Sequence, residues 1–448
     1  TMSRTYNGLE QLLQTVDADG GTTTYAYDGR GNPVAIQDAN GKQITTVFDA
    51  FSRKSSVTDP DMGQKTFVYS GFGELASETD ARGITLTYAY DTLGRMVQRT
   101  SSGTDAPSNW IFDTAPRTGG GTALGLLAKE LVGTEPTTAM SKTYTYDGLA
   151  RVHTITTSIR DDLGAVDTFT TGMQYDGGYG RQKAMEYPNG LTVGYDYNAR
   201  GYKTQVINAA SGYVYRQITA ASPRGQWESG NLAGGTYAVN RSFDATTGWA
   251  KDTELFLGAT ASGTLLHSES YSDYDIYGNL KIKNTSIRSA LAGGLTTSQE
   301  SYTYDNLHRL TVDSIGGVAG APTVTYSYDA VGNFQSKADY ASSYSYAPTS
   351  NRLQSVQLAG GGQKTFGYDA SGNLTQENGV TTIDYNVYNK PTVIRRPNVL
   401  GMAQSTEFDY GADLMRYRKV TQAGTETLYI NKLYEQITDG STVKERYY

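Results

Sequence analysis

Residues 25–32 read Tyr25-Ala26-Tyr27-Asp28-Gly29-Arg30-Gly31-Asn32, two aromatic rings two positions apart followed by a polar turn. Side chains two positions apart in a β-strand lie on the same face, so this stretch predicts a strand with both rings on one face. Asp28 suits the start of a turn because its carboxylate bonds to backbone N–H groups ahead of it, and glycine accepts positive φ. Val34-Ala35-Ile36 then predicts a return strand. The stretch therefore predicts one β-hairpin.

The hairpin signal recurs with a period of 21 residues near the start of the chain. Each period holds two strands of about six or seven residues and two short connections, so consecutive periods are expected to form neighbouring antiparallel hairpins. Stacked hairpins are expected to place ring beside ring, and such cross-strand pairs each contribute roughly 0.2–1 kcal/mol. The ring column is Tyr6, Tyr27, Phe48, Tyr69 and Tyr90, and an aspartate column keeps the same step at Asp17, Asp38, Asp59 and Asp80.

Beyond residue 100 the signature persists with looser spacing, which predicts one continuous repeat architecture over residues 1–448. The regular repeats cover residues 1–100, an irregular long hairpin or loop is expected at 101–141, and looser repeats follow at 142–448. The best candidate for a helix is the short stretch from Leu124 to Leu131. Smaller interruptions are expected at residues 259–266 and 289–297.

The pattern Tyr-x-Tyr-Asp-x-x-Gly-Arg-Met at residues 88–96 resembles the YD repeat of the RHS family. That family includes bacterial polymorphic toxins, the B/C components of insecticidal Tc toxins, and the animal teneurins. The segments at residues 110–115 and 187–191 also resemble segments of bacterial members. The resemblance implies a long β-sheet that spirals into a hollow shell, which in bacterial members encloses a C-terminal toxic domain.

The composition agrees with an all-β scaffold that has little or no helix. The chain has 36 tyrosines and 51 glycines but three histidines and no cysteine, so strand and turn formers replace helix formers and disulfides are excluded. A net charge of −7 argues against a nucleic-acid partner. No run of 18 apolar residues occurs, so no membrane-spanning segment is expected.

Two aspartate-rich turns need weighing as functional sites. Asp17-Ala18-Asp19-Gly20 and the turn at Asp59 resemble calcium loops, but the glycine and the oxygen ligand that an EF-hand requires are missing after Asp17. Turn-initiating hydrogen bonds explain the aspartate column better. Asp59-Pro60 also resembles the family's self-cleaving Asp-Pro motif, but it stands singly here and does not carry over. The autoproteolytic motif is expected downstream of this chain.

The histidines give no sign of a catalytic or metal centre. His153, His267 and His308 lie in separate repeats without the short spacing of zinc ligands, and His308 occupies a turn position where positive φ is expected. No Gly-x-Ser-x-Gly sequence marks a nucleophile, and pairs of carboxylates are too frequent to indicate glycoside hydrolysis. We therefore expect no catalytic, cofactor-binding or metal-ligating residue, no cofactor, and no enzyme activity.

The expected function is that of a structural shell in a secreted RHS-type toxin, which sequesters a C-terminal toxic domain until delivery. Its partners would be that domain, from the same parent chain, and secretion or delivery proteins. The alternative is an extracellular adhesion or recognition module that binds glycans or protein ligands, with exposed tyrosines as sugar platforms. Both ends of the sequence stop within the repeat pattern, so we expect a piece of a longer, exported polypeptide.

Overall fold

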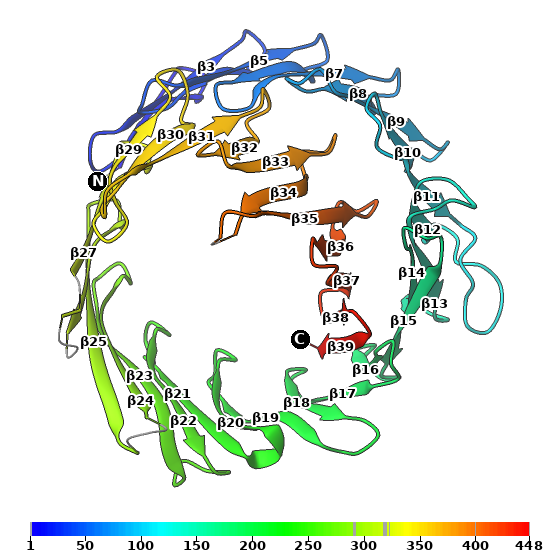
Figure 1. The fold of residues 1–448 in the computed structure, drawn as a ribbon, viewed down its shortest axis with the longest axis vertical. Coiled ribbons are helices and arrows are strands. Elements are labelled where there is room, and N and C mark those ends of the chain that lie inside the picture. The colour runs from blue at the N-terminus through cyan, green and yellow to red at the C-terminus, as the bar shows by residue number, and fades with distance from the viewer. Residues whose placement is uncertain (1, 290–292, 317–319, 322, 399, 448) are drawn as a thin grey trace. The chain divides into compact units, whose positions relative to one another are not determined.

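The computed structural model describes residues 2–289, 293–316, 320–321, 323–398 and 400–447, and it confirms an all-β protein (Figure 1). In these residues the chain forms a sheet of 39 strands, and the only helical element is the 3-10 turn η1 (Ala233–Gly235). Each described pairing joins a strand to its neighbour in sequence in antiparallel fashion, as in β3–β4 and β4–β5. The sheet is therefore a succession of hairpins, as the 21-residue period predicts.

The strands up to the middle of the chain are β1 (Ser3–Tyr6), β2 (Leu12–Val16), β3 (Thr22–Tyr27), β4 (Pro33–Gln37), β5 (Gln43–Phe48), β6 (Lys54–Asp59), β7 (Gly63–Tyr69), β8 (Leu75–Thr79), β9 (Thr85–Tyr90), β10 (Met96–Ser101), β11 (Ser108–Phe112), β12 (Leu127–Val132), β13 (Met140–Tyr146), β14 (Val152–Arg160), β15 (Val166–Tyr175), β16 (Gln182–Glu186), β17 (Thr192–Tyr197), β18 (Lys203–Asn208), β19 (Val214–Ala221) and β20 (Trp227–Leu232). The remaining strands are β21 (Tyr237–Phe243), β22 (Ala250–Leu257), β23 (Thr264–Tyr274), β24 (Leu280–Arg288), β25 (Leu295–Tyr304), β26 (Leu310–Gly316), β27 (Thr323–Tyr328), β28 (Phe334–Lys337), β29 (Ala341–Tyr346), β30 (Leu353–Leu358), β31 (Gln363–Tyr368), β32 (Leu374–Glu377), β33 (Thr381–Tyr385), β34 (Pro391–Pro397), β35 (Ala403–Tyr410), β36 (Arg416–Thr421), β37 (Glu426–Asn431), β38 (Tyr434–Asp439) and β39 (Thr442–Tyr447).

Each regular hairpin has a register shift at its second ring. The shift falls between Ala26 and Tyr27, and it recurs at the equivalent residues before Phe48 and Tyr69. Such a bulge bends the strand and increases its twist, so the same local feature is applied once per hairpin.

The chain divides into two compact units. The first contains the described parts of residues 1–170, 328–336 and 340–448, and the second contains residues 171–327 and 337–339 as far as they are described. Within the first unit, we call the described residues up to 170, which include β1–β14, the first tier, and the described residues of 328–336 and 340–448, which include β29–β39, the second tier. The turns of the second tier contact those of the first, and β29–β31 run beside β3–β7 in Figure 1.

The stretch from Leu124 to Leu131 is not helical, which corrects the sequence-based expectation. Its second half lies in β12, which pairs with β11 and β13. An isolated helix of this length is unstable in water, and pairing on both strand edges satisfies the backbone instead. The preceding loop packs inward, because Ala115 and Ala123 join Tyr146 in a buried apolar cluster.

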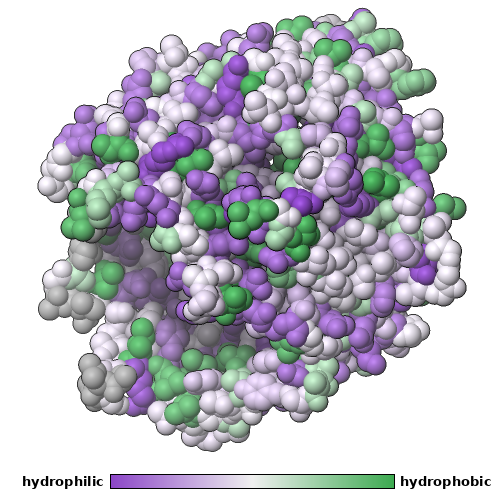
Figure 2. All heavy atoms as spheres, turned by 45° about the vertical axis from the view of Figure 1, so that its right-hand side comes forward, coloured by the Kyte–Doolittle hydropathy of each residue, from purple (hydrophilic) through white to green (hydrophobic). Residues whose placement is uncertain are grey.

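The first tier is a thin sheet. No side chain between residues 2 and 98 is fully buried, and Arg99 is the first buried residue in chain order. Strands such as β5 and β8 are part-exposed along their length. On the face drawn in Figure 2, hydrophobic side chains are scattered among hydrophilic ones. Cross-strand contacts within the sheet therefore contribute more here than a buried core.

Candidate functional site: the seam between two tiers

The turn after each second ring, which we call the YD turn, is closed by its aspartate. Asp28 Oδ1 accepts hydrogen bonds from the backbone N–H groups of Arg30 and Asn32, both at 2.9 Å. Its Oδ2 accepts a third bond from the Asn32 side-chain amide at 2.8 Å. These bonds, led by that of the Asn32 amide, lower the pKa of Asp28. The side chain four positions after the aspartate therefore completes the set of bonds to its carboxylate, which we call the aspartate cage. Arginine donates this bond in the pairs Asp49–Arg53, Asp91–Arg95, Asp147–Arg151 and Asp305–Arg309.

The opposite end of each hairpin carries the aspartate column, and we call this turn the Asp turn. Asp17 accepts bonds from the N–H groups of Asp19 and Gly21, and Asp38 does so from Asn40 and Lys42. The turn interpretation of this column is confirmed.

The second ring of the repeat links neighbouring hairpins through its hydroxyl. Tyr69 donates to the Lys54 carbonyl at 2.9 Å, and Tyr90 donates to the Leu75 carbonyl at 3.0 Å. The guanidinium of Arg53 also lies 4.5 Å from the centre of the Tyr69 ring. At these two positions neighbouring hairpins are therefore joined by a bond from a tyrosine hydroxyl to a backbone carbonyl, whereas the sequence predicted contacts between rings. We call this series of bonds the tyrosine ladder. The same bond is made by Tyr146, Tyr197, Tyr274, Tyr304, Tyr368 and Tyr410.

The two tiers meet where Asp turns of the first face YD turns of the second. The Asn40 amide donates to Asp329 Oδ2 at 2.8 Å, and the Asn351 amide donates to Asp38 Oδ2 at 2.9 Å. Burial opposes ionisation of Asp329, but the bonds from Asn40 and from its own turn lower its pKa overall. Residues more than 280 positions apart are therefore joined by reciprocal amide–carboxylate bonds.

The next Asp turn of the first tier holds the second tier through Asp61. Its Oδ1 accepts the backbone N–H of Asn351 at 2.7 Å, and its carbonyl accepts Arg352 Nε at 2.6 Å. The backbones approach closely here, because a Cβ built on Gly372 would lie 2.3 Å from the Asp61 carbonyl oxygen. Gly372 also has a φ of +81°, so glycine satisfies two requirements at once.

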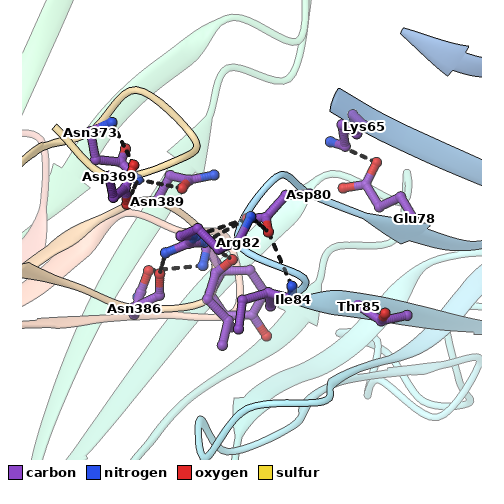
Figure 3. Close-up of polar contacts among 12 residues, drawn as sticks. Lys65, Glu78, Asp80, Arg82, Ile84, Thr85, Asp369, Asn373, Asn386 and Asn389 are labelled. Atoms are coloured by element: carbon purple, nitrogen blue, oxygen red, sulfur yellow. Dashed lines mark hydrogen bonds and ion pairs between the residues drawn. The ribbon is translucent and has the colours of Figure 1, made fainter. Parts of the chain in front are cut away.

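The Asp turn at Asp80 carries Arg82, which bridges the tiers (Figure 3). Its guanidinium donates to Asp80 of its own turn at 2.9 Å and to the carbonyls of Asn386 and Val387, both at 3.0 Å. The Val387 N–H in turn donates to Asp105 Oδ2 at 3.2 Å. Val387 is buried at this contact.

Arg99 is buried at the seam, with 8 % of its surface exposed. It donates to the Ser108 hydroxyl at 3.0 Å and to the Ala412 carbonyl of the second tier at 2.9 Å. Its guanidinium lies 5.4 Å from the Trp110 ring centre and 4.3 Å from that of Tyr388. Aromatic faces from both tiers therefore flank this buried cation.

Two clusters of charged residues continue the seam. Lys142 pairs with Glu130 and with Asp413 of the second tier. Burial alone would lower the pKa of Lys142, but the two carboxylates raise it overall. Further along, Arg418 of the second tier pairs with Asp162 of the first at 2.8 Å. Arg418 also pairs with its own-tier neighbours Asp409 and Glu426.

The histidines singled out in the sequence do not come together as a site. His308 has a φ of +64°, which confirms the expected turn conformation. Its Nδ1 lies 2.9 Å from the Asn279 amide, while His267 lies 3.7 Å from a Glu269 carboxylate oxygen. No cluster of metal-ligating side chains occurs in the described part of the chain. Within the same residues, no helix combines the length and apolarity needed to cross a membrane.

Comparison with known families agrees with the hairpin geometry. Residues 6–43 and 69–106 match the family model of the RHS repeat. The chain contains RHS repeats. No curated protein matches it significantly.

Solved structures share the fold of this RHS-repeat chain at low sequence identity. The crystal structure of TcdB2-TccC3-TEV superposes with a TM-score of 0.70 and 14 % identity, covering 99 % of this chain and 27 % of the other. TcdB2-TccC3 gives 0.66 and 13 %, with coverages of 99 % and 28 %. The Tc holotoxin pore of Photorhabdus luminescens gives 0.66 and 13 %, with 99 % and 27 %. The RHS-repeat chain thus spans about a quarter of the length of these relatives.

Proposed function

We propose that this RHS-repeat chain is part of the wall of a container that sequesters a toxic domain of its parent polypeptide until delivery. The observation that carries the proposal is the likeness of nearly the whole chain to TcdB2-TccC3, a toxin assembly. That likeness supports the fold directly and the container role by analogy.

Two features of the first unit suit a wall. Its first tier is a thin sheet with no fully buried side chain over residues 2–98. Its second tier attaches through the turns at the ends of its hairpins, so the sheet is extended edgewise at the seam. Edgewise extension enlarges the area that a given length of chain covers, whereas face-to-face stacking would halve it.

The role needs no catalytic centre in this chain. Asp49 is held in a turn cage by Arg53, which also lies over the Tyr69 ring, and such arrangements stabilise hairpins. The proposed partner is the toxic domain of the same parent chain, together with proteins that secrete or deliver it. The parent is proposed to be exported from a bacterial cell.

The test uses the complete gene product from which this chain is taken. After limited proteolysis, we expect its C-terminal domain to stay intact inside the folded protein and to become digestible once the shell is unfolded. The control is the same C-terminal domain expressed alone, which should be digested at once. If both are digested equally fast, the container proposal is wrong. The alternative of an adhesion or recognition module, assayed by binding to glycan and protein arrays, then takes its place.

A further inference from the structure

The third position of the Asp turn varies in chemistry along the column. The first position is always aspartate, because its carboxylate accepts backbone N–H groups within the turn. The second is small or rigid, being alanine or proline. The third residue contributes its backbone N–H to the cage, and its side chain is available for other contacts, as when Arg82 bonds both to Asp80 and across the seam. Along the 21-residue column the third position reads Asp19, Asn40, Asp61 and Arg82.

Three members of this column contribute contacts to the seam. Asn40 bonds to the carboxylate of Asp329, and Asp61 accepts the backbone N–H of Asn351. Arg82 donates to two backbone carbonyls, those of Asn386 and Val387. An amide thus meets a carboxylate, a carboxylate meets an N–H group, and a cation meets carbonyl oxygens. Each member has a different chemistry. Asn40 bonds to the YD turn of Asp329 and also to Asn351 Oδ1 at 3.3 Å, whereas Asp61 bonds to the YD turn of Asn351 and Arg82 to that of Asn386.

A repeat protein needs such a device because its other positions are nearly the same in every hairpin. Shifting the second tier by one hairpin would present the same aspartate cages and the same glycines, so these features resist a slip only weakly. The third positions do resist it. A slip by one hairpin in one direction would set Asp61 against Asp329, two carboxylates.

We propose that the side chains of Asn40, Asp61 and Arg82 determine which YD turn docks at each hairpin of the first tier, and so fix the register of the two tiers. We call these three side chains the address residues, and their set the address. The proposal concerns how the tiers find each other. It stands whether or not the parent protein encloses a toxic domain.

The decisive variant exchanges two address residues, Asp61→Arg with Arg82→Asp, which keeps the composition and net charge of the protein. Arginine at position 61 would face Arg352, and aspartate at position 82 would face two carbonyls and the carboxylate of Asp80. Hydrogen exchange read by mass spectrometry on peptides covering residues 347–353 and 385–390 reports the docking, because the Asn351 and Val387 N–H groups are bonded across the seam. We expect both peptides to exchange at least tenfold faster than in the unchanged protein.

The matched control exchanges the charges of an ion pair in the same part of the first tier, Lys65→Glu with Glu78→Lys. This pair joins β7 to β8 at 2.8 Å, so the exchange preserves an ion pair away from the seam (Figure 3). We expect the control to leave both reporter peptides within twofold of the unchanged protein.

Two results would overturn the proposal. One is unchanged exchange in both reporter peptides of the Asp61/Arg82 variant. The other is equally accelerated exchange in strands β7–β10 of that variant, because the third position would then be needed to fold the turn itself. The single variant Asp61→Ala introduces no repulsion and completes the test. It should accelerate exchange at residues 347–353 about tenfold, and equal acceleration at 385–390 would contradict a site-by-site address.

Discussion

Removing one hydroxyl from the tyrosine ladder measures how strongly neighbouring hairpins are joined. In Tyr90→Phe the ring stays in place, but the bond from its hydroxyl to the Leu75 carbonyl, 3.0 Å long, is lost. Burial raises the pKa of Tyr90, which agrees with a hydroxyl that is partly withdrawn from water. A net intramolecular hydrogen bond contributes about 0.5–1.5 kcal/mol, and the part-buried carbonyl is left without this donor. We expect the free energy of opening the joint to fall by about 1 kcal/mol.

The truncation Tyr90→Ala separates the hydroxyl from the ring. A fully buried aromatic ring costs about 3–5 kcal/mol when cut to alanine, but Tyr90 is only half-buried. The expected loss is therefore about 2 kcal/mol, roughly half of it from the hydroxyl. This estimate lowers the value of about 3 kcal/mol that a buried ring would imply from sequence alone.

The measurement must be local, because a chain of repeats opens in parts and need not unfold in one step. Native-state hydrogen exchange of the β8–β9 amides gives the opening free energy directly, and 1 kcal/mol corresponds to about fivefold in exchange rate. The control is Tyr179→Phe, whose side chain is 81 % exposed and which should change nothing. If Tyr90→Phe matches this control while Tyr90→Ala shows the full loss, the hydroxyl ladder contributes nothing and the reasoning fails.

Three further outcomes test the turns. The pKa of Asp176 is lowered to about 2, chiefly by a hydrogen bond from the arginine of its turn. The stability that this turn contributes is therefore present above about pH 4 and is lost as the pH falls through about 2. A carboxyl NMR titration midpoint near 4 would contradict this. Gly372→Ala should open the seam, because its new Cβ would lie 2.3 Å from a carbonyl oxygen. Gly332→Ala has open space around its new Cβ and adds only the backbone strain of about 1–2 kcal/mol at a φ of +95°. Equal rates of hydrogen exchange at the seam in the two variants would refute the steric argument. Ser70 holds its turn with two longer bonds of 3.2 Å, so Ser70→Asp alone should be neutral or destabilising beside Glu74, while Ser70→Asp with Glu74→Arg should gain about 0.5–1 kcal/mol in chemical denaturation. If the double variant is less stable than the sum of its two single changes predicts, the Asp–Arg cage is not a stabilising unit.

The local structure was largely predictable from sequence because its contacts are short in sequence. The Asp28 cage closes over four residues, and the ring-to-carbonyl bond of Tyr90 spans 15. Such contacts repeat with the 21-residue period and need no knowledge of distant parts of the chain. The same reasoning correctly placed His308 in a turn with positive φ. It failed at Leu124–Leu131, where pairing with β11 and β13 outweighed a weak helical pattern.

The sequence also contained the signal for the seam, although reading one repeat at a time could not find it. The variation at Asn40, Asp61 and Arg82 stands out only when the rest of the turn is seen to be constant, and nothing in the period names the partners of these residues.

The sequence by itself determined the hairpins, their period and their turn chemistry. Only the tertiary structure decided which turns meet across 289 residues at Asn40 and Asp329, or across 313 residues at Arg99 and Ala412. The physical reason is that each hairpin adds a small twist and bend, and the position of the second tier depends on their sum over many strands. A local pattern specifies each increment only approximately, so the accumulated uncertainty reaches the width of a hairpin. Side-chain contacts made after the chain has returned are needed to select the register.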